Sequence, residues 1–369
     1  MNPELQQTFF EIIRLGIGNG RSNNDLFNYL PNTTDWNSLE ALAMRQGLLG
    51  IIVDGIEKLP GDNRPPQTLL LQWIGQTVEG FENRYEPYCR TIAKMAGWYN
   101  SHGYKMMLLK GLACGLDWPK PQHRPYGDID IWLFGQQKEA DETLEAWSKS
   151  LNVQGFKIDH SHHHHTIFTL NGFTVENHYD FINIHHHKSN VEFESILKTL
   201  AQNSTRFVMV NGEKVYLPSP NLNALFLLKH TMCHFAAEGI TLRQILDWGF
   251  FVKEHKDEVD WFLVEQTLER FGMKRLYDIF NAICVDELGF ELKLFPKIQY
   301  SPILKDKVLK DILGPEFSRR MPKGLLRRTV YKYRRWKANE WKHELCYNDS
   351  MKSAFWSGVR NHILKPCSI

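Results

Sequence analysis

In "LLKGLACGLDWPKPQHRPYGDIDIWLFG", residues 108–135, two aspartates stand one residue apart inside an apolar run. Side chains alternate faces along a β-strand, so Asp128 and Asp130 project together while Ile129 and Ile131 pack on the other side. Two carboxylates on one face repel each other unless a cation lies between them, and oxygen ligands of this kind suit Mg²⁺. The pattern predicts a metal-binding strand, and the structural alternative is a solvated strand face.

A predicted hairpin downstream adds a third carboxylate. "HTIFTL" (165–170) and "FTVENHYDF" (173–181) alternate like β-strands, and the Asn171-Gly172 pair between them fits a two-residue turn. This turn fixes the register, so that one face of the hairpin is apolar and Glu176 lies on the other. The polar face then carries the side chains His163, His165, Thr169, Thr174, Glu176, His178 and Asp180.

Three carboxylates on one sheet face indicate metal-assisted phosphoryl transfer. Such a set holds one or two divalent ions, which neutralise a triphosphate and activate a hydroxyl. Lys110 and Gly111 fit the same chemistry, because a glycine at the start of a helix lets backbone N–H groups approach a phosphate and a lysine adds positive charge.

The same stretch resembles the signature of the nucleotidyltransferase superfamily, which has the polymerase-β-like fold. It is most similar to a bacterial branch that reads "LKG", then "RPxGDIDI" after a short insert, and later an acid followed two residues on by histidine. The helical segments "LEALAMRQGLLGIIVDGI" (39–56) and "LKHTMCHFAAEGITLRQILDW" (228–248) resemble that branch too. The similarity spans most of the chain and is strongest from about 104 to 180.

The resemblance implies a metal-dependent nucleotidyltransferase. Asp128, Asp130 and Glu176 would be the catalytic and metal-binding residues, holding Mg²⁺ or Mn²⁺, with Glu176 polarising the attacking hydroxyl. A nucleoside triphosphate such as ATP would donate its NMP to an acceptor hydroxyl of a small molecule, a protein or an RNA, and pyrophosphate would leave. The third acid is Glu here, whereas better-known members of the superfamily have Asp.

The resemblance also implies a nucleotide-binding set. Lys110 and Gly111 fall on the phosphate-binding turn, Arg124 matches a second phosphate contact, and His178 matches the histidine that follows the third acid. Leu112 stands where better-known members have serine, which removes a hydroxyl that would touch the phosphate. These departures motivate a second hypothesis, a non-catalytic protein that binds a nucleotide or a partner through a degenerate site.

Apolar periodicity divides the chain of 369 residues into three regions. Residues 1–103 and 218–369 repeat apolar positions at helical spacing, whereas the period falls to two between 104 and 217. We therefore expect an α+β fold, with a small mixed-sheet nucleotidyltransferase-like core flanked by N-terminal and C-terminal helical regions. Before the core, helices are expected over 5–16, about 35–59 and about 67–101, and within it one helix over about 137–150.

Composition argues for a cytoplasmic protein without membrane segments. The six cysteines are scattered with no CxxC pair, which indicates reduced thiols rather than a disulfide scaffold. No apolar run approaches the roughly 20 residues that span a bilayer, and the N-terminus lacks the features of a secretory signal. The net charge of +2 gives no overall attraction to nucleic acid or membrane.

Two histidine-rich stretches and a basic C-terminal stretch remain. In "DHSHHHHTIF" (159–168) and "INIHHHKSN" (182–190), contiguous histidines point to opposite faces and no CxxC or helical HxxxH completes a tetrahedral set, so structural zinc is not expected. His163 and His165 are instead expected beside Glu176, in contact with substrate or phosphate.

The stretch "RRMPKGLLRRTVYKYRRWKANEWKH" (319–343) interleaves basic and aromatic residues, which is compatible with RNA or a phosphorylated acceptor. We favour the alternative, an amphipathic helix with its aromatic side chains packed inward. "HTMCHF" (230–235) is likewise interpreted as a packed helix rather than a thiol site.

Overall fold

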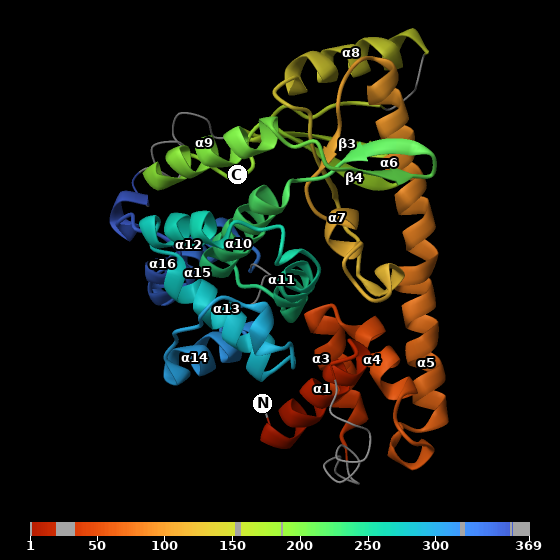
Figure 1. Cartoon of the computed structure of the whole chain (residues 1–369), viewed down its shortest axis with the longest axis vertical. Coiled ribbons are helices and arrows are strands. Elements are labelled where there is room, and N and C mark those ends of the chain that lie inside the picture. Colours follow the sequence, from red (N-terminus) through yellow and green to blue (C-terminus); the bar gives the residue numbers. More distant parts are fainter. Residues whose placement is uncertain are drawn as a thin grey trace.

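The computed structural model describes residues 2–19, 34–151, 156–185, 187–317, 322–354 and 356. In this part of the chain a six-stranded mixed sheet is flanked by many helices, so the fold is α+β as expected. Helices α5 (Gln67–Thr77) and α6 (Asn83–Ser101) run along one side of the molecule, and the C-terminal helices lie on the other (Figure 1).

The N-terminal region is helical, as its periodicity predicted. Its first helices are α1 (Pro3–Gly16), α3 (Trp36–Gln46) and α4 (Leu49–Glu57). The single helix expected over 35–59 is in fact two, because Gly47 adopts the left-handed conformation (φ 69°) and ends α3. The helix expected over 67–101 is confirmed, with a π-helical turn at Val78–Glu82 joining α5 to α6.

The sheet places the aspartate strand at its centre, in the strand order β3-β4-β2-β1-β6-β5. The strands are β1 (Met107–Leu108), β2 (Ile129–Trp132), β3 (His165–Leu170), β4 (Phe173–His178), β5 (Phe207–Val210) and β6 (Glu213–Tyr216). β2 pairs with β4 in parallel, and the β3–β4 hairpin has the predicted register, with His165 opposite His178. Asn171 (φ 51°) and Gly172 (φ 80°) are both left-handed, as a type I′ turn requires.

The apolar face of the sheet packs on α6. Ile129, Ile131 and Val175 are fully buried in one cluster with Ile92 and Met95 of that helix. Because alternate side chains of β2 point the other way, this packing leaves the aspartates on the opposite face, as the sequence predicted.

The core contains more helices than expected. They are α7 (Leu112–Gly115), α8 (Gln137–Ser150) and α9 (Lys188–Gln202), and only α8 was predicted. The prediction of a single helix is therefore wrong. The signal for α9 was present, because Phe193, Leu197 and Ala201 recur at intervals of four and are all buried.

Beyond the sheet the chain is helical, as expected. The helices are α10 (Pro220–Ala237), α11 (Leu242–His255), α12 (Trp261–Arg270), α13 (Lys274–Asp286), α14 (Pro302–Leu313), α15 (Leu325–Ala338) and α16 (Glu340–Cys346). One large core cluster contains side chains from both helical regions, for example Ile52 and Leu225. Every cysteine in the described residues is a free thiol, and Cys367 lies outside them. None of the helices described is both long and apolar enough to span a membrane.

Helix α15 departs from the packed amphipathic helix that we favoured. None of its described side chains is buried, and Tyr333 is 55% exposed beside a row of exposed basic residues. The expectation of inward aromatic packing is wrong for Tyr333, although Trp341 in α16 does pack against the core. Part of the predicted stretch, residues 319–321, lies outside the described residues.

Candidate active site

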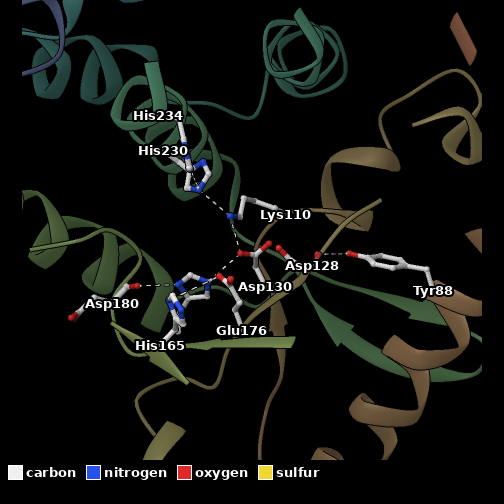
Figure 2. A network of polar contacts seen from close by, with 10 residues as sticks. Tyr88, Lys110, Asp128, Asp130, His165, Glu176, Asp180, His230 and His234 are labelled. Atoms are coloured by element: carbon white, nitrogen blue, oxygen red, sulfur yellow. Dashed lines mark hydrogen bonds and ion pairs between the residues drawn. The ribbon is translucent and has the colours of Figure 1, made fainter. Parts of the chain in front are cut away.

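The acidic residues of β2 and β4 lie side by side on the sheet face opposite α6. Asp130 is the register partner of Glu176 in the parallel pair, so their side chains are neighbours. Asp128 precedes β2 by one residue, and its backbone carbonyl accepts a hydrogen bond of 3.0 Å from the hydroxyl of Tyr88 in α6. Figure 2 shows the three carboxylates gathered in one place.

Asp130 is a buried carboxylate with two basic neighbours. Its Oδ1 lies 2.8 Å from Lys110 Nζ and 3.1 Å from His178 Nε2. Burial acts to raise the pKa of Asp130, but the charge of Lys110 and the hydrogen bond with His178 outweigh it and hold the pKa well below its usual range. Asp130 is therefore ionised at neutral pH.

Glu176 lies between two imidazoles. Its Oε2 is 3.4 Å from His178 Nε2 and 4.0 Å from His165 Nδ1. Burial acts to raise the pKa of Glu176, but the hydrogen bond with His178 prevails and the net shift is downward. Burial lowers the pKa of His165 to about 4, so that ring is neutral at physiological pH.

Asp128 shows the effect of crowding three carboxylates together. Its pKa is raised, first by burial and then by repulsion from the charges of Glu176 and Asp130. Among the ion pairs of the described residues, none joins Asp128 to a basic side chain as closely as Lys110 is joined to Asp130.

The turn after β1 positions Lys110 and requires glycine at position 111. Gly111 has φ 63°, and a Cβ there would lie 2.2 Å from the hydroxyl oxygen of Tyr88. Lys110 Nζ also lies 2.9 Å from Nε2 of His230, which belongs to α10. The helix that follows the turn, α7, has only four residues, so it adds little of the dipole expected for phosphate binding.

These groups open into a cavity of about 840 Å³ between the sheet and the C-terminal helices. Asp128, Asp130 and Glu176 line one side, and His230 and Arg243 line the other. A volume of this size is within the range of roughly 300–1,000 Å³ that accommodates small-molecule ligands and cofactors.

Residues 32–288, more than half of the chain, match the sequence profile of a family described as uncharacterised nucleotidyltransferases. The chain belongs to this family. It also resembles a solved structure, an antigenic nucleotidyltransferase-like protein from Paracoccidioides brasiliensis, with 18% identity and a TM-score of 0.31, over 45% of this chain and 75% of that one. No curated protein matches the chain. Family membership supports nucleotidyl transfer in general and leaves the substrate open.

Most residues predicted for the nucleotide and metal site come together, but Arg124 has another partner. Its guanidinium makes two hydrogen bonds to the carboxylate of Asp247 in α11, with Nε–Oδ1 2.8 Å and Nη2–Oδ2 2.9 Å, and both residues are buried. Arg124 does line the cavity. Its role as a phosphate contact stays a prediction.

Helices α10 and α11 contribute side chains to the cavity that were not predicted from the sequence. His230 contacts Lys110, and the next turn of α10 brings His234 Nε2 to 3.3 Å from His230 Nε2. The signal was visible as two histidines four residues apart, which share a helix face. The helix does pack as predicted, through Met232 and Phe235 among others, but its histidine face borders the cavity. Nothing in the sequence alone linked Asp247 to the site.

Proposed function

We propose that this protein transfers an NMP from a nucleoside triphosphate to an acceptor hydroxyl and releases pyrophosphate, with Mg²⁺ or Mn²⁺. The observation that carries the proposal is the register of β2 and β4, which sets Asp130 beside Glu176, next to Asp128, in the wall of a ligand-sized cavity. Membership of a nucleotidyltransferase family supports the same reaction.

The residues present fit a divalent metal ion. Asp128, Asp130 and Glu176 offer carboxylate oxygens, which Mg²⁺ and Mn²⁺ prefer. The pKa of Asp128 is raised first by burial and then by repulsion from its two acidic neighbours. A bound cation would relieve this repulsion. When bound, the ion would neutralise developing charge on the phosphates.

The other side chains bind and orient. Glu176 is held ionised, so its carboxylate can accept a proton from the acceptor hydroxyl. Lys110 keeps Asp130 ionised and places a positive charge where the triphosphate would lie. The cavity has room for a nucleotide and part of an acceptor, and the side chains of α10 and α11 across from the sheet would contact that acceptor.

Pyrophosphate release tests this function. Each of the four NTPs is incubated with Mg²⁺ or Mn²⁺ and a cell extract as the source of acceptor. We compare the wild type with the double variant Asp128→Asn, Asp130→Asn and with Asp257→Asn, whose side chain is 88% exposed and remote from the cavity. We expect metal-dependent release that falls by at least about 100-fold in the double variant alone. Equal release in all three proteins would contradict the proposal.

A non-catalytic nucleotide-binding protein is the second candidate. It is favoured by one observation: Lys110 and Arg124, the basic groups predicted to contact phosphate, are already paired with Asp130 and Asp247. This candidate predicts no pyrophosphate release by any of the three proteins. It also predicts that nucleotide affinity, measured by calorimetry, survives the change Asp128→Asn.

A further inference from the structure

Three buried or half-buried groups beside the carboxylate pair form a cluster of their own. A nitrogen of His165, an oxygen of Glu176 and a nitrogen of His178 all lie within 4.8 Å of one another. The cluster borders Asp130, whose Oδ1 is 3.1 Å from His178 Nε2. Two imidazoles and a carboxylate make a donor set that differs from the three carboxylates of the proposed Mg²⁺ site.

The ring of His178 is oriented by its second nitrogen. Nδ1 lies 3.3 Å from the backbone carbonyl oxygen of Asp180, and a carbonyl can only accept, so Nδ1 carries a proton. In the neutral ring, Nε2 then points a lone pair at the carboxylates of Asp130 and Glu176. Lys110 offsets part of this negative charge at Asp130, and either a proton on Nε2 or a bound metal ion would offset the rest.

His165 distinguishes between a proton on His178 and a metal ion as the cation at this position. The residue is only 7% exposed and lines the cavity. Its Nδ1 is buried, yet it has no hydrogen-bond partner among the described residues. A proton on His178 would leave His165 Nδ1 unsatisfied. A metal ion would engage both rings and Glu176 at once.

We propose that His165, Glu176 and His178 bind a divalent first-row transition metal ion. A tetrahedral ion with bonds of about 2.1 Å needs ligand atoms roughly 3.4 Å apart. Glu176 Oε2 lies 3.4 Å from His178 Nε2 and 4.0 Å from His165 Nδ1, and the ligand atoms of the three residues all lie within 4.8 Å of one another, so binding an ion would draw them closer. Imidazole favours such metals over Mg²⁺. The carbonyl of Asp180 plays the usual part of a group that fixes the tautomer and orientation of a metal-binding histidine.

The position of this site deepens the proposed function. An ion here would lie beside the proposed Mg²⁺ site and could lower the pKa of a coordinated hydroxyl. Only this role for the ion rests on the proposed function. Binding of the ion does not depend on nucleotidyl transfer.

Calorimetric titration with Zn²⁺ in the absence of nucleotide tests the site. We compare the wild type with His165→Asn and His178→Asn. The matched control replaces a neighbouring histidine pair outside the cluster, His163→Gln with His185→Gln, whose rings lie 4.9 Å apart. We expect one tight site per chain, weakened by at least about 100-fold in each single variant and unchanged in the control.

The proposal would be overturned if the wild type had no tight Zn²⁺ site, or if both single variants bound Zn²⁺ as tightly as the wild type. Loss of Zn²⁺ affinity in the control alone would also overturn it, because it would mean chelation by surface histidines. The visible spectrum of Co²⁺ bound to the wild type gives a check that needs no variant, since four-coordinate nitrogen and oxygen ligation absorbs strongly. Asp128→Asn separates the two proposals, because it should abolish pyrophosphate release and retain the Zn²⁺ site.

Discussion

Asp130 illustrates how single residues make this site. Its buried carboxylate stays ionised because Lys110 and His178 both reach Oδ1, and neither neighbour is adjacent to it in the sequence. Asp128, two residues away, has the opposite pKa shift, because burial and its acidic neighbours raise it. The two aspartates therefore differ in their tendency to ionise although their side chains lie on the same face of the sheet.

At the same scale, Gly111→Ala should destabilise the fold by about 1–3 kcal/mol. A Cβ would lie 2.2 Å from the Tyr88 hydroxyl oxygen, and φ 63° is unfavourable for alanine. Denaturant unfolding measures the loss, with Gly61→Ala as control because no atom lies within 4 Å of its added Cβ. Adding Tyr88→Phe to Gly111→Ala should recover part of the stability. A stable single variant would show that this turn tolerates a side chain.

At the scale of elements, α9 anchors the segment that follows β4. Glu194 of α9 accepts hydrogen bonds from the backbone N–H groups of Phe181 (2.9 Å) and Ile182 (3.1 Å). Both of these residues line the cavity. A helix that was not predicted from the sequence thus positions part of the cavity wall.

This anchor predicts a pH dependence of stability. Burial raises the pKa of Glu194 from 4.5 to about 7 in the folded protein. Protonated Glu194 therefore stabilises the fold fully below pH 4.5, and this stabilisation is lost as the pH rises through 7. The free energy of unfolding should fall by on the order of 3 kcal/mol at most. Denaturant unfolding from pH 4.5 to 8 should show this decline in the wild type and a weaker one in Glu194→Gln. Parallel curves for the two proteins would argue against it.

The exposed basic helix α15 should bind polyanions. Arg327, Arg328, Lys332 and Arg334 are all exposed on it. Replacing these four residues with serine should weaken binding to single-stranded RNA. It should also reduce the slope of log affinity against log salt by up to about 3, because each neutralised phosphate contributes about 0.7. Lys138→Ser with Lys149→Ser, on the exposed side of α8, is the control. An unchanged slope would remove α15 as a nucleic-acid contact.

At the scale of the whole molecule, the sheet core and the C-terminal helices are joined through buried polar contacts. Arg124 in the core pairs with Asp247 in α11, and Trp118 Nε1 donates to the same carboxylate at 2.8 Å. The cavity lies between the two parts that this pair connects. The position of the C-terminal helices therefore shapes the cavity.

Asp247→Asn should accordingly cost about 3–5 kcal/mol of stability, because it leaves the buried charge of Arg124 without its partner while keeping an acceptor for Trp118. The double variant Arg124→Leu, Asp247→Leu should be more stable than the single one. Thermal unfolding of the three proteins measures both differences. If the single and double variants unfold together, the pair contributes no specific stabilisation.

The local geometry of the site follows from the amino-acid sequence alone. A period of two fixed which side of β2 is apolar, and Asn171-Gly172 fixed the hairpin register that puts Glu176 and His178 on the polar face. Both follow from backbone geometry within a few residues, since alternation and turn type need no distant partner. The family signature added the expected chemistry.

Contacts across long sequence separations depend on the tertiary structure and could not be read from the sequence. The tertiary structure pairs Arg124 with Asp247, brings His230 to Lys110, and leaves His165 Nδ1 buried without a partner among the described residues. These contacts depend on how whole helices pack against the sheet, and helical periodicity gives the face of a helix but not its neighbour. For the same reason the exposure of α15 could not be predicted, because a helix rich in both basic and aromatic residues is compatible with packing or with solvent.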